Sequence, residues 1–198
     1  TGASTMFEVK RAANILLESG ASSVIPMHCV LSYPTKALDA NLRVINSLKQ
    51  EFEDCVIGYS DHTLADPSMI TLSTAYQLGA RVIEKHFTLD KTVKGGDHLH
   101  SMDMHDLAVF ISNVKLMDAN QGCDDRLVFE CEKVSRKNAR RSVVISRGVK
   151  KGCEIGHEDI TYKRPCSGIS TADWDEVLGK LAKKDLPADH ILQWSDLE

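Results

Sequence analysis

Two kinds of hydrophobic pattern alternate along residues 1–121. In four segments, apolar residues recur three or four positions apart, which predicts helices over Phe7–Ser19, Leu38–Phe52, Pro67–Leu78 and Met104–Met117. Between them lie short, continuous apolar runs, which predict strands over Ser23–Val30, Cys55–Tyr59 and Arg81–His86. Strands that are apolar throughout are typical of parallel sheets covered by helices. The pattern therefore predicts an α/β fold, either a barrel or an open doubly wound sheet.

The pattern changes after residue 121. Residues 122–137 begin with Gly122-Cys123-Asp124-Asp125-Arg126 and are interpreted as a linker. A short β-like run follows at Arg141–Ser146, and Thr171–Gly179 is predicted to be a short helix capped by Ser170 or Thr171. Residues 138–198 are therefore expected to form a small, separate α+β module.

Composition excludes several classes of function. The formal net charge of -4 over 198 residues argues against nucleic acid as the main partner. No apolar run approaches the ~20 residues that a membrane span needs. No GxGxxG motif follows a predicted strand, so a dinucleotide-binding fold has no support. The six cysteines form no CxxC pair, and scattered cysteines of this kind are typical of reduced thiols in a cytoplasmic protein.

Polar side chains gather at the end of each predicted strand. They are His28-Cys29, then Ser60-Asp61-His62, then Glu84-Lys85-His86, and Gly95-Gly96-Asp97-His98 lies on the loop after the third strand. Parallel strands end at the same edge, which is where barrel and open-sheet enzymes carry their chemistry. Imidazoles with nearby carboxylates suit a divalent metal such as Mn²⁺, Fe²⁺ or Zn²⁺.

Each cluster also has a structural interpretation. A single strand-end histidine is more often a hydrogen-bonded structural residue than a metal ligand. Asp61 can accept backbone N–H bonds in the turn after its strand, and Tyr33-Pro34 can form a turn because proline holds its predecessor extended. The same polarity at the same end of three strands favours the functional interpretation. Because side chains alternate along a strand, Lys85 is expected to point away from Glu84 and His86.

Six motifs occur in a fixed order along the chain. They are His28–Thr35, Gly58–Thr63, Glu84–Asp90, Gly95–His98, Ala139–Val144 and Lys163–Pro165. Together they closely resemble the sialic acid (N-acetylneuraminate) synthase family, with its legionaminate, pseudaminate and spore-coat relatives. The resemblance covers essentially the whole chain, and the order of the motifs carries it more than any one motif does. Two positions depart from the family pattern: Leu31, where the family often has a polar residue, and Cys166-Ser167, where it commonly has Gly-Asn.

This resemblance implies a fold and an activity. Residues 1–121 would be the C-terminal portion of a TIM-type (β/α)8 barrel, and residues 138–198 an antifreeze-like (SAF) domain. The implied reaction condenses phosphoenolpyruvate with an N-acetylated amino sugar such as N-acetylmannosamine. It gives a nine-carbon sialic-acid-type sugar acid and phosphate, by C–O cleavage. A divalent metal, Mn²⁺ or Mg²⁺, is the implied cofactor, and a domain-exchanged homodimer is the implied assembly.

The resemblance also implies roles for individual residues. His62 and His86 match the family's metal ligands. Glu84 is implied to orient the sugar or exchange a proton with one of its hydroxyls. Arg164 matches a catalytic arginine that the SAF domain sends into the active site of the partner subunit. The residues matched to substrate contacts are Tyr33, Ser60, Asp97 and Arg164, of which Ser60 would contact phosphoenolpyruvate.

Three strands fall short of the eight in a barrel, which typically takes ~250 residues. The chain is therefore expected to be the C-terminal part of a longer enzyme, and to be inactive and poorly stable alone. The resemblance implies that the family's phosphoenolpyruvate-binding lysines lie upstream. Two other functions stay open. One is a different metal-dependent barrel aldolase or lyase, which would not need Arg164. The other is a non-catalytic carbohydrate-binding remnant, which would not bind metal through His62 and His86.

Overall fold

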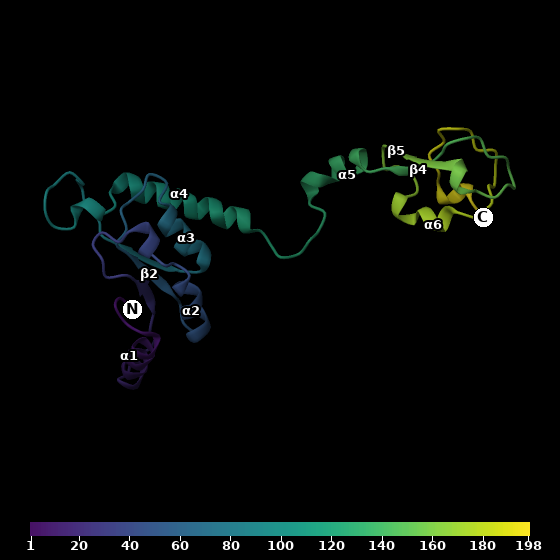
Figure 1. Cartoon of the computed structure of the whole chain (residues 1–198). Helices are drawn as coiled ribbons and strands as arrows, with labels where there is room; N and C mark the ends of the chain where they lie inside the picture. The colour runs from purple at the N-terminus through teal and green to yellow at the C-terminus, as the bar shows by residue number, and fades with distance from the viewer. The chain divides into compact units, whose positions relative to one another are not determined.

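The computed structural model describes all of residues 1–198. The chain divides into two compact units, Thr1–Cys123 and Asp124–Glu198 (Figure 1). Each unit has its own buried core. No helix in either unit combines the length and the hydropathy needed to cross a membrane.

A three-stranded parallel sheet with the order β1-β2-β3 forms the centre of the first unit. Its strands are β1 (Met27–Cys29), β2 (Gly58–Asp61) and β3 (Val82–Lys85). Its helices are α1 (Met6–Glu18), α2 (Val44–Glu51), α3 (Ile70–Leu78) and α4 (Met104–Gln121). Because strand order follows chain order and helices connect the strands, this unit is a run of β/α repeats, and the predicted α/β class is confirmed.

The strand register separates two faces of this sheet. Cys29, Ser60 and Glu84 occupy one row across the three strands, and His28, Tyr59 and Ile83 occupy the row before it. Tyr59 is buried in the core that the sheet forms with α2 and α3, which lie along one side of the sheet in Figure 1. Side chains alternate along a strand, so the row of Ser60 faces away from these helices.

Several element boundaries differ from the predicted ones. The first and third strands are shorter, and β2 begins at Gly58 and continues through the polar pair Ser60-Asp61. The predicted helix over 38–52 is a short 3₁₀ turn followed by α2. Helix α4 begins where predicted: Asp103 accepts hydrogen bonds from the N–H groups of His105 and Asp106.

An antiparallel pair of strands forms the centre of the second unit. They are β4 (Ser142–Ile145) and β5 (Ile160–Lys163), accompanied by α5 (Lys133–Ala139) and α6 (Trp174–Val177). The predicted cap of the short helix is present, because Ser170 Oγ accepts a hydrogen bond from the N–H of Ala172. Most of α5 lies within residues 122–137, the segment interpreted as a linker.

Single 3₁₀ turns complete both units. They are η1 (Ala37–Asp39), η2 (His98–His100), η3 (Glu130–Glu132), η4 (His157–Asp159), η5 (Thr171–Asp173) and η6 (Trp194–Asp196).

Candidate metal and substrate site

His62 follows β2 directly and is buried. Its Nδ1 lies 2.8 Å from the carbonyl oxygen of Val30, on the segment that follows β1. A carbonyl oxygen can only accept, so Nδ1 is the donor of this bond, and the neutral tautomer that fits leaves the lone pair on Nε2. This arrangement, in which a backbone carbonyl fixes the tautomer and orientation of an imidazole, is the usual one for a metal-ligating histidine.

Four rings converge at the C-terminal ends of the strands. Tyr33 and His62 have ring centroids 4.3 Å apart, and His62 and His86 are 5.3 Å apart at 68°. His100, which the sequence reasoning did not single out, lies 4.9 Å from His86 and 5.8 Å from Tyr33. The sequence-based expectation that His62 and His86 meet across neighbouring strands is thus met in the geometry.

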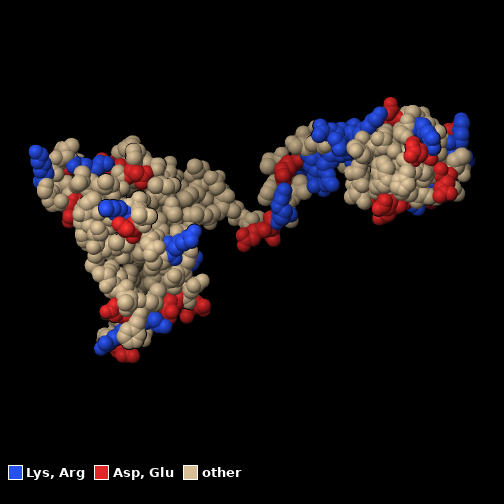
Figure 2. Space-filling model, in the orientation of Figure 1, with Lys and Arg blue, Asp and Glu red and all other residues tan.

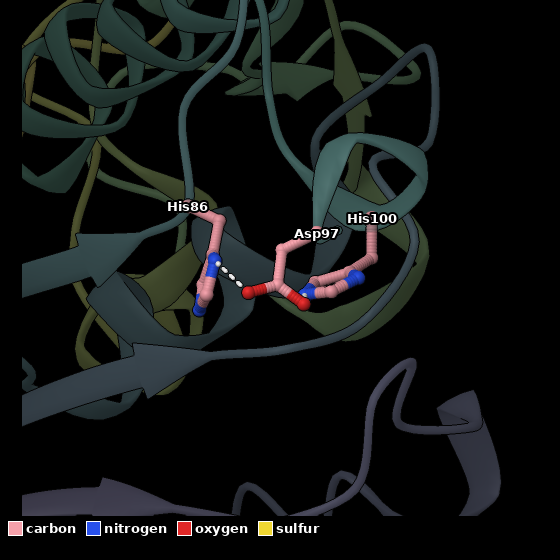
Figure 3. A group of neighbouring side chains, drawn as sticks. All are labelled: His86, Asp97 and His100. Carbon is pink, nitrogen blue, oxygen red and sulfur yellow. Dashed lines mark ion pairs between the residues drawn. The ribbon is translucent and has the colours of Figure 1, made fainter. Parts of the chain in front are cut away.

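Asp97 brings a carboxylate to two of these histidines. Its Oδ2 lies 3.4 Å from His86 Nδ1, and its Oδ1 lies 3.8 Å from His100 Nε2. Figure 3 shows the carboxylate between the two imidazoles, with one oxygen toward each. The potential ligand atoms of His86, Asp97 and His100 all lie within 4.8 Å of one another. This set of donors can hold a divalent ion.

His100 is the most deeply buried member of this group. Its side chain is 4% exposed, and its Nε2 has no hydrogen-bond partner. Burial lowers the pKa of His100, and the nearby His86 lowers it further, so the neutral imidazole is favoured. A neutral imidazole is the form that binds a metal.

Ser60 and Glu84 form a pair on the same strands. Ser60 Oγ donates a hydrogen bond of 2.7 Å to Glu84 Oε1, between residues that are direct partners in the register of β2 and β3. Ser60 is buried, whereas Glu84 is exposed. The carboxylate of Glu84 is therefore fixed by one hydrogen bond and accessible to a further donor.

Asp61 and Lys85 form a buried ion pair on the opposite face of the sheet. Lys85 Nζ lies 2.6 Å from Asp61 Oδ2, and both side chains are 1% exposed. Asp61 also accepts hydrogen bonds from the backbone N–H and the hydroxyl of Thr63. The structural interpretation of Asp61 is thus confirmed, as is the expectation that Lys85 points away from Glu84.

Two other histidines of the predicted polar clusters are occupied elsewhere. His28 stacks on Tyr59 with ring centroids 5.6 Å apart, and its Nε2 donates to the carbonyl oxygen of Ala40 at 2.8 Å. His98 hydrogen-bonds through Nδ1 to the hydroxyl of Thr88 at 2.7 Å. The motif at 95–98 pointed to this loop, but the imidazole that faces the site is two residues further on, at His100.

Arg164 belongs to the second unit. It is exposed, and its Nε donates to the carbonyl oxygen of Ala139 at 2.9 Å. The next residue, Pro165, is tied to β4 because Ser142 Oγ donates to its carbonyl oxygen at 2.7 Å. Lys and Arg side chains also gather over α5 of this unit (Figure 2), from Lys133, Arg136 and Lys137. The unit therefore carries a basic surface in addition to Arg164.

Similarity to known proteins covers both units. Residues 1–126 match the NeuB family, and residues 140–198 match the SAF domain. The chain is 34% identical over 195 residues to the N,N'-diacetyllegionaminic acid synthase of Campylobacter jejuni, covering 98% of this chain and 57% of that protein. It is 33% identical over 204 residues to the N-acetylneuraminate-9-phosphate synthase of Drosophila melanogaster, covering 91% of this chain and 54% of that protein.

A solved structure is similar to the whole length of this chain. The spore coat polysaccharide biosynthesis protein E of Chromobacterium violaceum matches with a TM-score of 0.73 and 27% identity, covering 100% of this chain and 59% of that one. The chain thus spans little more than half the length of these relatives. The resemblance expected from the six motifs is confirmed, and the chain belongs to the NeuB family, with a SAF domain over residues 140–198.

Proposed function

We propose that this chain is part of a cytoplasmic enzyme that condenses phosphoenolpyruvate with an N-acetylated amino sugar, N-acetylmannosamine or a related sugar. The products are a nine-carbon sugar acid and phosphate. Two relatives are synthases of such sugar acids, which supports the class of reaction. The observation that carries the proposal is the meeting of Tyr33, His62, His86 and Asp97 at one end of three parallel strands.

The donor groups fit a divalent cation, either Mn²⁺ or Mg²⁺. His62 offers Nε2 because its Nδ1 proton is bonded to Val30, and the ring of His86 lies beside it. When bound, the ion would act as a Lewis acid on the aldehyde oxygen of the open-chain sugar. The two histidines carry no negative charge when neutral, so they would leave the ion most of its polarising power.

The remaining side chains have roles in orientation and proton transfer. Glu84, held by the hydroxyl of Ser60, can accept a hydrogen bond from a sugar hydroxyl and exchange its proton. Ser60 would contact phosphoenolpyruvate by redirecting its single O–H from Glu84 to that substrate. Tyr33 and Asp97 border the imidazoles and would position the sugar. Carbon 3 of phosphoenolpyruvate attacks the aldehyde carbon, and water adds at carbon 2. Phosphate then leaves as the bond from carbon 2 to its bridging oxygen breaks.

We also propose that the three strands are part of a closed TIM-type barrel. β1 and β3 are the edges of a three-stranded sheet, and such edges are closed in a barrel. Helix α1 exposes neighbouring apolar side chains, Phe7 at 72% and Ile15 at 51%, which line one hollow of its surface. Contiguous apolar surface of this kind is normally covered.

Arg164 distinguishes the proposed synthase from another metal-dependent aldolase, which would not need this residue. In a domain-exchanged homodimer its guanidinium would make paired hydrogen bonds to substrate oxygens in the partner subunit. The test measures phosphate release from phosphoenolpyruvate, with N-acetylmannosamine and Mn²⁺, on the product of the complete gene. Arg164→Ala is expected to lower kcat/KM by about 10- to 100-fold, as loss of a hydrogen bond from a charged group does.

Arg136→Ala is the matched control, because Arg136 is an exposed arginine of the same unit. Equal activity of the Arg164→Ala variant and the parent would favour the aldolase alternative. Because a three-stranded sheet does not close a barrel, residues 1–198 alone are expected to show no turnover, and full turnover by this chain would refute the need for a closed barrel.

A further inference from the structure

We propose that His100 is a metal ligand, and that with His86 and Asp97 it forms a two-histidine, one-carboxylate site for a divalent transition-metal ion. This site takes Mn²⁺, Fe²⁺, Co²⁺ or Zn²⁺ in preference to Mg²⁺. A catalytic role for this site rests on the proposed function, whereas metal binding by the three residues does not. Neither the resemblance nor the His62–His86 pair assigns any role to His100.

The geometry of the three side chains leaves a place for an ion. His86 and His100 each face a different oxygen of the Asp97 carboxylate, at 3.4 Å and 3.8 Å. Both distances exceed the usual 2.7–3.2 Å of an N–H···O bond. Two ligand atoms at ~2.0–2.2 Å from a shared ion can be about 3–4.4 Å apart. These two separations therefore match the spacing of ligands around a cation better than that of hydrogen-bond partners.

The second observation is the unpartnered nitrogen of His100. Its Nε2 is buried without a hydrogen bond, in a side chain that is 4% exposed. Leaving a buried polar group unsatisfied costs ~1–3 kcal/mol, and such groups are rare in folded proteins. A structural histidine would be expected to have a partner, as His28 has in the carbonyl oxygen of Ala40. Coordination of an ion by Nε2 would supply that partner.

The backbone holds the ligands in place. Met102 donates its N–H to the carbonyl oxygen of His86 at 2.8 Å, which joins the end of the loop to the residue after β3. Ser101 Oγ donates to the carbonyl oxygen of Asp97 at 2.7 Å, across the 3₁₀ turn that contains His100. These bonds anchor the loop that carries Asp97 and His100 beside His86, and a backbone held in this way is a property of built metal sites.

The ligand types determine the class of metal. Imidazole nitrogen suits borderline ions such as Zn²⁺, Fe²⁺ and Co²⁺, and Mn²⁺ accepts it alongside a carboxylate. Mg²⁺ prefers oxygen ligands and gives up its water reluctantly. A second facing imidazole at His100 therefore shifts the preference of this site away from Mg²⁺.

Mn²⁺ titration of the 198-residue chain, followed by the electron paramagnetic resonance signal of free Mn²⁺, tests the proposal without substrate. His100→Gln is expected to weaken Mn²⁺ binding at least about 10-fold, the lower end of what loss of an outer-shell partner costs. His105→Gln is the matched control, because His105 is an exposed histidine on α4 and should bind Mn²⁺ like the parent. A large excess of Mg²⁺ should leave the bound Mn²⁺ in place.

Because His100 is buried, its replacement also affects folding, so a second measurement uses the unaltered chain. With ¹⁵N-labelled histidine, saturating Zn²⁺ should shift the Nε2 resonance of His100 and leave the resonances of His105 unchanged. Equal Mn²⁺ affinity of the His100→Gln variant, displacement of Mn²⁺ by Mg²⁺, or an unmoved Nε2 resonance would each overturn the proposal. The two proposals can fail separately. An active synthase whose ion is held by His62 and His86 alone would fail these tests of His100. A chain that binds metal through His86, Asp97 and His100 but shows no turnover would pass them.

Discussion

Replacing either member of the Asp61–Lys85 pair should destabilise the first unit, and the two replacements should differ in size. Nζ and Oδ2 lie 2.6 Å apart, and both side chains are almost completely excluded from solvent. Removing one partner of a buried ion pair typically costs ~3–5 kcal/mol, because the other charge is left uncompensated. The surroundings of each charge decide where in this range each variant falls.

Asp61 is the better supported of the two charges. Without Lys85, its carboxylate still accepts from the hydroxyl of Tyr59 and from the N–H and hydroxyl of Thr63. Without Asp61, the Lys85 ammonium keeps the carbonyl oxygen of Thr63 as an acceptor for three N–H donors. We therefore expect Lys85→Met to cost ~3 kcal/mol and Asp61→Ala to cost ~5 kcal/mol. The double variant should cost less than the sum, since no charge is left unpaired.

Urea unfolding with two probes separates the units. Both tryptophans, Trp174 and Trp194, belong to the second unit, so their fluorescence follows that unit alone. Far-UV circular dichroism reports α1 to α4, which make up most of the helix in the chain. The variants should move the circular dichroism transition and leave the fluorescence transition unchanged. Lys94→Met, at an exposed lysine, should shift neither by more than ~0.5 kcal/mol. A Lys85→Met transition equal to the parent's, or a milder effect of Asp61→Ala, would refute the reasoning.

Three further predictions follow from other buried groups. Burial lowers the pKa of His28, so the unfolded chain binds this proton at a higher pH than the folded chain. The first unit should therefore lose stability as the pH falls below ~6.5, by up to ~1.4 kcal/mol per pH unit, in urea titrations followed by circular dichroism. Gly58→Ala should cost ~1–3 kcal/mol in thermal unfolding, because its Cβ would lie 2.6 Å from Met27 Cγ and 2.9 Å from a backbone oxygen of β3. Ser142→Ala should cost ~1–3 kcal/mol by tryptophan fluorescence in urea, because this buried hydroxyl makes three hydrogen bonds to the loop Pro165–Gly168.

Each of these predictions has a matched control. Replacing His28 with Phe should reduce the pH dependence of the first unit to the part that His100 contributes, since burial lowers the pKa of His100 as well, and an unchanged slope would contradict the assignment. Gly148→Ala should cost less than Gly58→Ala, because the nearest atom to its Cβ is 3.7 Å away. Ser146→Ala should be milder than Ser142→Ala, because water can replace the exposed hydroxyl of Ser146.

Apolar runs predicted the order of strands and helices but not their ends. They report burial, whereas a strand is defined by hydrogen bonds to its neighbours, and β2 pairs with both neighbours over its polar residues Ser60 and Asp61. Local backbone geometry accounts for two other differences. Asn41 has φ of 43° and interrupts the predicted helix before α2, and Met69 has φ of 51° and delays the start of α3 beyond Pro67. Helical periodicity carries no signal for such left-handed residues.

The candidate site was predictable where it lies on strands. Alternation along β3 correctly predicted that Lys85 points away from Glu84. The loop after β3 was different, because its polar residues have no fixed period. The 3₁₀ turn at 98–100 directs His98 to the hydroxyl of Thr88 and brings His100 to the other rings, which spacing alone does not predict.

The surroundings of β2 explain why the polar residues Ser60-Asp61-His62-Thr63 come soon after the apolar pair Val56-Ile57. Tyr59 and Asp61 point to the face covered by helices, where Asp61 uses its acceptor capacity on Tyr59, Thr63 and Lys85. Ser60 points to the other face, where it holds Glu84. The bonds of Asp61 fix the turn that carries His62, while His62 itself bonds to the segment after β1 through one nitrogen. Stability and chemistry are thus divided between the two faces of one strand. Loss of the buried pair should therefore weaken Mn²⁺ binding as well as folding, although neither Asp61 nor Lys85 is a proposed ligand.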